Sequence, residues 1–276
     1  MNISILLKVF FALISLIWAL YFASEGFKFE LYGIALGFTF SLIVDGLVWL
    51  NAYWVFLKLY VNCIINPSKR VRLSMAYLYR IQHKGLFLLV KNSRFELTKY
   101  QPVGGVYKYF NDEVSHLFNE LTLFEDSDIA NDEISKFDLR LRMTKRKHLK
   151  SFLNWFFSYK NREVSPWREF YEELIEDEIL TSSNFKYINY ELVSQHIEPI
   201  HEDQHHNKID TFKYVDVFKP KYINSIQKEE MTNLQNEVSD KYIWVTEDEI
   251  HAKQSKSGHL IAPHTYKILT NKNLKR

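Results

Sequence analysis

Two long apolar runs open the chain, and a polar, charged sequence follows them. The first run covers residues 3–23 and carries a single charge, Lys8, and the second covers about residues 31–57. A helix that crosses a bilayer needs about 20 consecutive apolar residues, so both runs are long enough. The pattern predicts an N-terminal hairpin of two transmembrane helices within residues 1–60.

Two other interpretations of these runs fit less well. A secretory signal peptide has a shorter apolar core, roughly 7–15 residues, followed by a small-residue cleavage site. The first run instead ends in Leu20-Tyr21-Phe22-Ala23-Ser24-Glu25 and leads directly into the second run. Core helices of a soluble domain fit the length and flanking charges less well. Positive charges follow the second run at Lys58, Lys69 and Arg70, which predicts that both termini are cytoplasmic.

Asp45 is the one acidic residue inside either predicted span. An ionisable group at that depth is costly and usually turns toward a protein interior or water. Asp45 therefore lies in a helix interface or pore lining, or it pairs with Thr39, Ser41 or another subunit. Two helices alone cannot enclose a pore, so a function in permeation requires a homo-oligomer.

Nearly all charged residues lie beyond the hairpin. Residues 61–74 are interpreted as a juxtamembrane linker and residues 75–276 as a cytoplasmic domain. The net charge of +2 argues against binding to a nucleic acid polymer. The single cysteine, Cys63, excludes an intrachain disulfide and a cysteine-rich zinc site.

The polar part of the chain alternates between strand and helix patterns. Strands are predicted within 76–90 (two strands meeting at a turn) and at 95–100, 137–143, 186–193, 212–218 and 242–245. Helices are predicted at about 111–131, 152–159, 166–176 and 246–250. The last of these begins with a capping box, Thr246 with Glu249 three residues later. The pattern predicts an α+β domain.

An acidic helix is the first candidate site. Ser165-Pro166-Trp167 provides a capping hydroxyl and a proline, which favour a helix start. Glu169, Glu172 and Glu173 follow at spacings that place them on one helical face. Carboxylates so close together repel unless a cation lies among them, and Mg²⁺ favours oxygen ligands. The alternative is that acidic residues are simply favoured near helix N-termini.

Basic residues form the second candidate site. Arg140 and Arg142 lie on one face of a predicted strand, and Lys145, Arg146 and Lys147 form the densest basic cluster. They would contact phosphates of a nucleotide ligand, or they form a solvated helix face next to the membrane. Residues 196–206 are rich in histidine and carboxylates, but their spacing matches no zinc site. Proline in that stretch predicts a loop.

Parts of the domain resemble the Nudix family, whose signature is G-x5-E-x7-R-E-U-x-E-E-x-G-U, with U a bulky aliphatic residue. Residues 102–105 resemble the strand end that introduces the signature, residues 168–173 match R-E-U-x-E-E, and residues 244–250 resemble the closing strand and turn. The resemblance implies a Nudix-like α/β/α sandwich with a mixed sheet. It also implies a ligand-binding role for Gly104 and Gly105, and a magnesium-binding role for the three glutamates of the acidic helix.

The sequence departs from the signature in ways that bear on activity. A long insertion, about residues 111–166, separates the glycine pair from the acidic helix. Asn111 stands where the signature has its first glutamate, and Ile175 replaces the later glycine. Nucleotide binding is therefore the expected property rather than hydrolysis, with phosphate contacts in the basic part of the insertion.

The whole chain resembles the SMODS-associated Nudix effectors of cyclic-oligonucleotide antiphage systems (CBASS), which are encoded beside a CD-NTase. That resemblance implies a multi-pass protein of the inner membrane that senses a cyclic di- or trinucleotide and then disrupts the lipid bilayer. One alternative is a membrane-tethered, magnesium-dependent Nudix hydrolase of a nucleoside diphosphate derivative. The other is an assembly protein whose domain only docks a partner.

Overall fold

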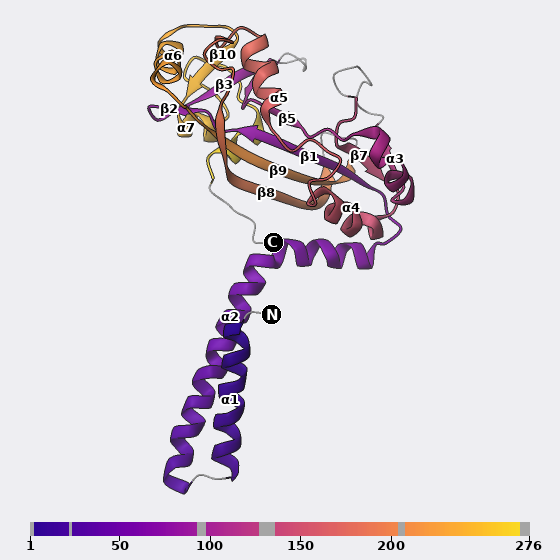
Figure 1. Cartoon of the computed structure of the whole chain (residues 1–276), viewed down its shortest axis with the longest axis vertical. Coiled ribbons are helices and arrows are strands. Elements are labelled where there is room, and N and C mark those ends of the chain that lie inside the picture. Colours follow the sequence, from indigo (N-terminus) through magenta and orange to yellow (C-terminus); the bar gives the residue numbers. More distant parts are fainter. Residues whose placement is uncertain (1–2, 22–23, 93–97, 127–135, 204–207, 271–276) are drawn as a thin grey trace. The chain divides into compact units, whose positions relative to one another are not determined.

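The structure is a computed structural model that describes residues 3–21, 24–92, 98–126, 136–203 and 208–270. It divides into two compact units, residues 1–57 and residues 58–274. Figure 1 shows the elements of both units.

The N-terminal unit is a pair of antiparallel helices (Figure 1). Helix α1 covers Ile3–Tyr21, and α2 covers Glu25–Ile65. Lys8 Nζ lies 2.6 Å from Asp45 Oδ2, so a lysine of α1 neutralises the acidic residue of α2. Asp45 thus lies in a helix interface, where an ion pair lowers the cost of a charge among apolar residues.

One segment of this pair is long and apolar enough to cross a membrane. That segment is Phe27–Leu47, of 21 residues, in α2. The described apolar part of α1, Lys8–Tyr21, is shorter, so the prediction of two spans is supported for one helix. Helix α2 continues to Ile65, past the predicted end near residue 57, because no helix-breaking residue precedes Pro67.

The second unit is built on two β-sheets. The larger has the strand order β6-β7-β1-β9-β8, with β5 also paired to β1, and the smaller has the order β10-β3-β2, with β4 paired to β3. Strand β1 runs parallel to β9 and antiparallel to β5 and β7, so the larger sheet is mixed. The strands are β1 Val71–Tyr79, β2 Gln82–His83, β3 Leu86–Asn92, β4 Lys99–Gln101, β5 Gly104–Val106, β6 Leu123–Glu125, β7 Arg140–Met143, β8 Asn189–Asp203, β9 Ile209–Lys221 and β10 Tyr242–Val245.

Short helices connect these strands (Figure 1). They are α3 Asn111–Glu120, the 3-10 turn Arg146–His148, α4 Leu149–Phe156, α5 Trp167–Phe170, α6 Ser225–Asn236, α7 Glu247–Ala252 and the 3-10 turn Pro263–Ile268. After α5 the chain continues as a wider π-helical turn over Tyr171–Glu176. The mixed α+β architecture predicted from the sequence is confirmed.

The core joins both sheets. Its buried side chains include Leu78 of β1 and Val217 of β9 from the larger sheet, and Leu89 of β3 and Val245 of β10 from the smaller. Apolar residues that alternate along each strand point to the same face, which is why these four meet. The predicted strand at 242–245 and the capping box of Thr246 and Glu249 are both confirmed.

Three predicted elements have other limits in the structure. The loop predicted at residues 196–206 is wrong over residues 196–203, which belong to β8, and residues 204–206 lie outside the described residues. Strand β8 is an edge strand with an irregular register between Glu198 and His201, where Pro199 is tolerated. The helix predicted to about residue 131 ends at Glu120, followed by a turn at Thr122 with φ of 54°. Residues 95–97 of the strand predicted at 95–100 lie outside the described residues, and Lys99 and Tyr100 belong to β4.

Candidate functional site

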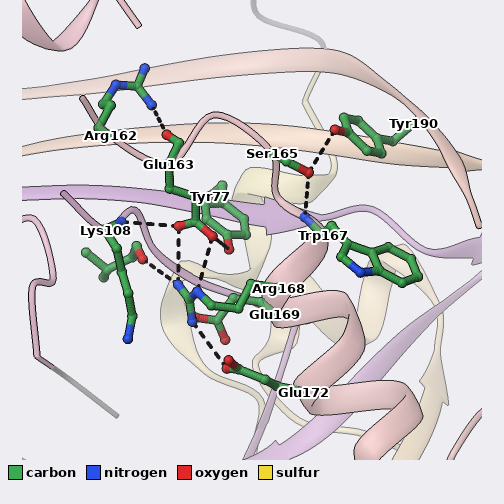
Figure 2. Close-up of polar contacts among 11 residues, drawn as sticks. Tyr77, Lys108, Arg162, Glu163, Ser165, Trp167, Arg168, Glu169, Glu172 and Tyr190 are labelled. Carbon is green, nitrogen blue, oxygen red and sulfur yellow. Dashed lines mark hydrogen bonds and ion pairs between the residues drawn. The ribbon is translucent and has the colours of Figure 1, made fainter. Parts of the chain in front are cut away.

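The acidic helix begins where the sequence predicts. A cation that belongs to the protein itself lies among its carboxylates. Figure 2 shows the Arg168 guanidinium surrounded by carboxylates. Its Nη1 donates to Glu169 Oε1 at 2.6 Å and to Glu172 Oε2 at 3.2 Å. Its Nε and Nη2 donate to the two oxygens of Glu163 at 3.1 and 3.3 Å. Burial opposes the charge on Arg168, yet the carboxylates of Glu169 and Glu163 hold its pKa above the usual value.

Glu163 is a site residue that the sequence did not single out. Besides Arg168, its carboxylate accepts hydrogen bonds from the backbone N–H of Lys108 at 3.1 Å and from the Tyr77 hydroxyl at 3.4 Å. Its own N–H donates to the Lys108 carbonyl at 2.8 Å. Arg162 Nη1 donates to the Glu163 carbonyl, which fixes the backbone on the other side. Glu163 thus joins β1, the end of β5 and the acidic helix.

The insertion is closed at its base, and this explains why Glu163 was missed. Tyr109 and Arg162 form an antiparallel bridge, so residues 110–161 make an excursion that returns to its starting point. When that excursion is set aside, Glu163 follows Gly105 after five residues, which is the G-x5-E spacing of the Nudix signature. Four residues separate Glu163 from Arg168 where the signature has seven, so Glu163 matches the spacing to the glycine but not the spacing to the acidic helix.

The glycine pair packs directly against the acidic helix. The Gly104 N–H donates to Glu173 Oε2 at 2.9 Å. A Cβ on Gly105 would lie 1.8 Å from Glu169 Oε1, so only glycine leaves room for that carboxylate. The predicted neighbourhood of Gly104, Gly105 and the glutamates is therefore present in the structure.

The side chains as arranged do not form a magnesium site. Among the described residues, no three His, Cys, Asp or Glu side chains form a group that could hold a metal ion. Glu169 and Glu172 share the Arg168 cation, whereas Glu173 turns to Gly104. The wider turn that begins at Tyr171 also alters the i, i+4 spacing on which the prediction rested. The structure therefore places a protein cation, Arg168, beside Glu169 and Glu172 where the sequence predicted Mg²⁺, and it gives Glu173 a backbone N–H donor.

Cationic side chains border one side of this cluster. Arg140 Nη1 lies 3.7 Å from Asp138 Oδ2, and the backbones of Asp138 and Lys108 form a bridge. Burial raises the pKa of Asp138 to about 6, against the opposing charges of Arg140, Lys108 and Arg168. Asp138 and Lys108 were not predicted as site residues, because only the sheet brings them beside the acidic helix.

The buried Asp138 makes a testable prediction about pH. Its pKa is raised from 3.8 to about 6, so the folded state binds a proton more tightly than the unfolded state, and stability falls as pH rises through that window. Asp138→Asn removes this effect, so it should raise the free energy of unfolding at pH 7 by roughly 2–3 kcal/mol. Urea unfolding at pH 7 and pH 4 measures the gain, which should disappear at pH 4. The exposed Asp177→Asn serves as the control, and an equal gain from it would contradict the assignment.

The other predicted basic residues lie elsewhere in the domain. Along β1, Val71 pairs with Met143 at the end of β7, whereas Leu78 pairs with Gly104. Strands rise about 3.3 Å per residue, so these two ends are roughly 20 Å apart. Lys145 and Lys147 follow Met143 and are therefore not brought to the glycine pair.

The guanidinium groups of Arg142 and Arg146 both bind carboxylates of the protein. Arg142 Nε donates to the buried Asp126 carboxylate at 2.7 Å, which also accepts from Arg72 at 2.5 Å. Arg146 is only 2 % exposed and forms a salt bridge with Asp210. The guanidinium of Arg146, which was predicted to contact a ligand, is buried in this structure and bonded to protein atoms. Of the predicted basic ligands, only Arg140 borders the site.

Comparison with known proteins finds one family. A family model described as the SMODS-associated NUDIX domain matches residues 70–269. No curated protein and no solved structure matches the chain.

Proposed function

Because the chain belongs to the SMODS-associated NUDIX domain family over residues 70–269, we propose that it is a CBASS antiphage effector that senses a cyclic nucleotide made by a CD-NTase. Family membership supports an effector role in CBASS-type systems. The observation that carries the proposal is the order of parts, since a helix able to cross a membrane directly precedes the Nudix domain. A binding domain tied to a membrane helix is positioned to pass a ligand signal to the membrane or to another copy of itself.

The proposed ligand site is the edge where Lys108 and Arg140 lie beside Arg168 and its glutamate partners. Phosphates would contact Lys108 and Arg140, since charge-assisted hydrogen bonds to phosphate are the strong ones. Asp138, whose pKa is about 6, would be protonated when a phosphate approaches, so anion affinity should increase as pH falls toward 6. Gly104 and Gly105 let β5 lie close to β1 and to Glu169, which builds this edge.

Aromatic side chains on the same helix suit the base of a nucleotide. The Tyr171 side chain is 44 % exposed, and its ring lies 6.3 Å from that of Trp167. Trp167 in turn stacks on the buried Phe170 at 5.6 Å, which holds it in place. Bases bind single-stranded nucleotide sites largely by stacking on such rings. We propose that Tyr171 and Trp167 receive a base of the ligand.

The proposed output is in the membrane. Helices α1 and α2 would form a two-span hairpin with both termini cytoplasmic, in the inner membrane. Two helices per chain cannot enclose a pore, so disruption of the bilayer requires several copies. The ligand must then bind the assembled state more tightly than it binds the separate chains, so that ligand binding favours assembly.

The second candidate function is a membrane-tethered, magnesium-dependent Nudix hydrolase. The observation that favours it is the presence of four glutamates, Glu163, Glu169, Glu172 and Glu173, within one cluster beside the glycine pair. In the present arrangement these groups bind Arg168 and Gly104 rather than forming a metal site.

The test uses the full chain in lipid nanodiscs with a panel of cyclic di- and trinucleotides, in Mg²⁺ or in EDTA. Calorimetry measures binding, and mass spectrometry of the recovered ligand measures cleavage. We expect binding with the ligand recovered intact. Lys108→Glu with Arg140→Glu should weaken it at least about tenfold, since hydrogen bonds to charged groups contribute about 1.5–3 kcal/mol each. Lys186→Glu with Lys228→Glu makes the same charge change on exposed residues and should leave binding intact.

Each other outcome contradicts the proposal in a different way. Ligand cleaved in Mg²⁺ but intact in EDTA would replace the sensor by the hydrolase, and Glu172→Gln and Glu173→Gln should then abolish turnover. If no nucleotide binds, the remaining alternative is an assembly protein whose domain docks a protein partner.

A further inference from the structure

Two basic segments far apart in the sequence lie side by side at the end of α2. The Arg146 N–H donates to the Lys69 carbonyl at 3.0 Å, and the Lys147 N–H donates to the Pro67 carbonyl at 3.2 Å. The turn that follows β7 is thereby fixed to the turn that follows α2. We call the exposed cations of these two turns the basic collar; they are Lys69, Arg70, Lys145, Lys147 and Lys150.

A buried arginine holds the collar together. The Arg146 guanidinium donates to Asn62 Oδ1 of α2 at 2.8 Å and to the Arg70 carbonyl at 3.1 and 3.3 Å. It also pairs with the carboxylate of Asp210 at the start of β9. Arg146 is 2 % exposed, so its role is to position the five exposed cations rather than to bind a ligand.

The two segments of the collar carry positive charge and no acidic residue of their own. Neither residues 66–70 nor residues 145–150 contain an aspartate or glutamate. Lys150 Nζ lies 5.7 Å from the centre of the Tyr60 ring of α2, so the cluster reaches the helix itself. Burial, together with the charges of Lys147 and Lys145, lowers the pKa of His148 against the opposing charge of Glu120.

An apolar surface adjoins this charge. At the end of α2, Val61, Ile64 and Ile65 are 43, 77 and 70 % exposed, and their spacing places them on one helical face. Leu59 is 1 % exposed, so the opposite side of the helix end is buried against the domain. A helix end that exposes large aliphatic side chains beside lysines is typical of segments that lie in a membrane interface.

We propose that the basic collar and the apolar end of α2 together bind the anionic phospholipid surface of the bilayer. The aliphatic side chains would enter the boundary of the acyl chains, and the lysines would contact headgroup phosphates. This assigns Lys145 and Lys147 to lipid, whereas the ligand site lies at the other end of β1. The proposal is independent of the cyclic nucleotide, because none of these residues belongs to the ligand site.

The test compares the full chain in nanodiscs of phosphatidylcholine with nanodiscs that contain equal parts of phosphatidylglycerol. Hydrogen–deuterium exchange is measured in peptides that cover residues 58–72 and 143–151. Juxtamembrane cations gain affinity for anionic lipid, so we expect exchange in both peptides to be about tenfold slower with phosphatidylglycerol. Lys69→Glu with Lys145→Glu and Lys147→Glu should remove this protection.

A matched variant controls for net charge and folding. Lys186→Glu with Lys228→Glu and Lys256→Glu changes three exposed lysines outside the collar and should keep the protection. Thermal unfolding of both variants in detergent checks that they remain folded. Ile64→Ser with Ile65→Ser should weaken protection in both lipids while leaving its dependence on phosphatidylglycerol.

Two results would overturn the proposal. One is equal exchange in the two lipids, which would mean that headgroup charge is not recognised. The other is protection of these peptides by cyclic nucleotide or inorganic phosphate in phosphatidylcholine alone. That result would make the collar a soluble-phosphate site, and it would be distinguishable from failure of the ligand site, which is measured with the Lys108 and Arg140 variants.

Discussion

Replacing Arg168 by alanine should lower the free energy of unfolding of the Nudix domain by about 3 kcal/mol. The side chain is 23 % exposed, and its partners Glu163 and Glu169 are 13 and 14 % exposed. Removing one partner of a largely buried ion pair costs about 3–5 kcal/mol, because the other charges stay buried without compensation. The lower value applies since water reaches part of the cluster.

The measurement is thermal unfolding of the full chain in detergent, with tryptophan fluorescence as the signal that monitors unfolding. For a domain of this size, a loss of about 3 kcal/mol corresponds to a fall of roughly 6–12 °C in Tm. The defect should shrink when Glu169→Gln is added, since one unpaired charge is then removed. Arg70→Ala changes an exposed arginine and is the control. A fall no larger than that of the control would show that the carboxylates do not depend on Arg168.

Gly104→Ala should destabilise the domain by about 3 kcal/mol or more and abolish ligand binding. A Cβ at this position would lie 2.3 Å from the Tyr77 carbonyl oxygen and 2.8 Å from the Leu78 Cα, both backbone atoms of β1. The backbone also has φ of +153°, which side chains rarely adopt. Overpacking costs about 1–3 kcal/mol and a strained backbone adds a similar amount. Strand β5 would have to separate from β1.

Gly105→Ala is the matched variant, because its obstacle is a side chain instead of the backbone. The added Cβ would displace the Glu169 carboxylate, which lies at the end of a flexible side chain and can move away. We expect a smaller fall in Tm than for Gly104→Ala, together with weaker ligand binding, since Glu169 would no longer fix Arg168. Urea unfolding and calorimetry on both variants separate the two effects. Equal loss of stability in the two variants would mean that the contact with β1 is not what requires glycine at position 104.

Local signals in the sequence predicted the parts whose structure depends on near neighbours. The apolar run of α2, the helix start at Ser165-Pro166 and the capping box of Thr246 and Glu249 all follow from residues a few positions apart. The same is true of β10, whose short apolar pattern is bounded by polar residues. Periodicity and capping are read along the chain, so no knowledge of the fold is needed.

The candidate site was only partly predictable for the opposite reason. The sequence identified Glu169, Glu172 and Glu173 and the glycine pair, but it treated the glutamates as a metal site. It could not show that Arg168 would turn inward and compensate two of them. Which cation neutralises a carboxylate depends on side-chain directions, and those are set by packing against β1 and β5.

By itself the sequence determined the segment that is long and apolar enough to cross a membrane, the α+β composition and the acidic helix, because each is encoded in short-range patterns of polarity. Only the tertiary structure decided that the insertion closes on Tyr109 and Arg162 and so brings Glu163 to the glycine pair. It also decided that Arg146 is buried while Lys145 and Lys147 remain exposed beside α2. Burial and ion pairing join residues tens of positions apart, and a linear pattern carries no distance between them.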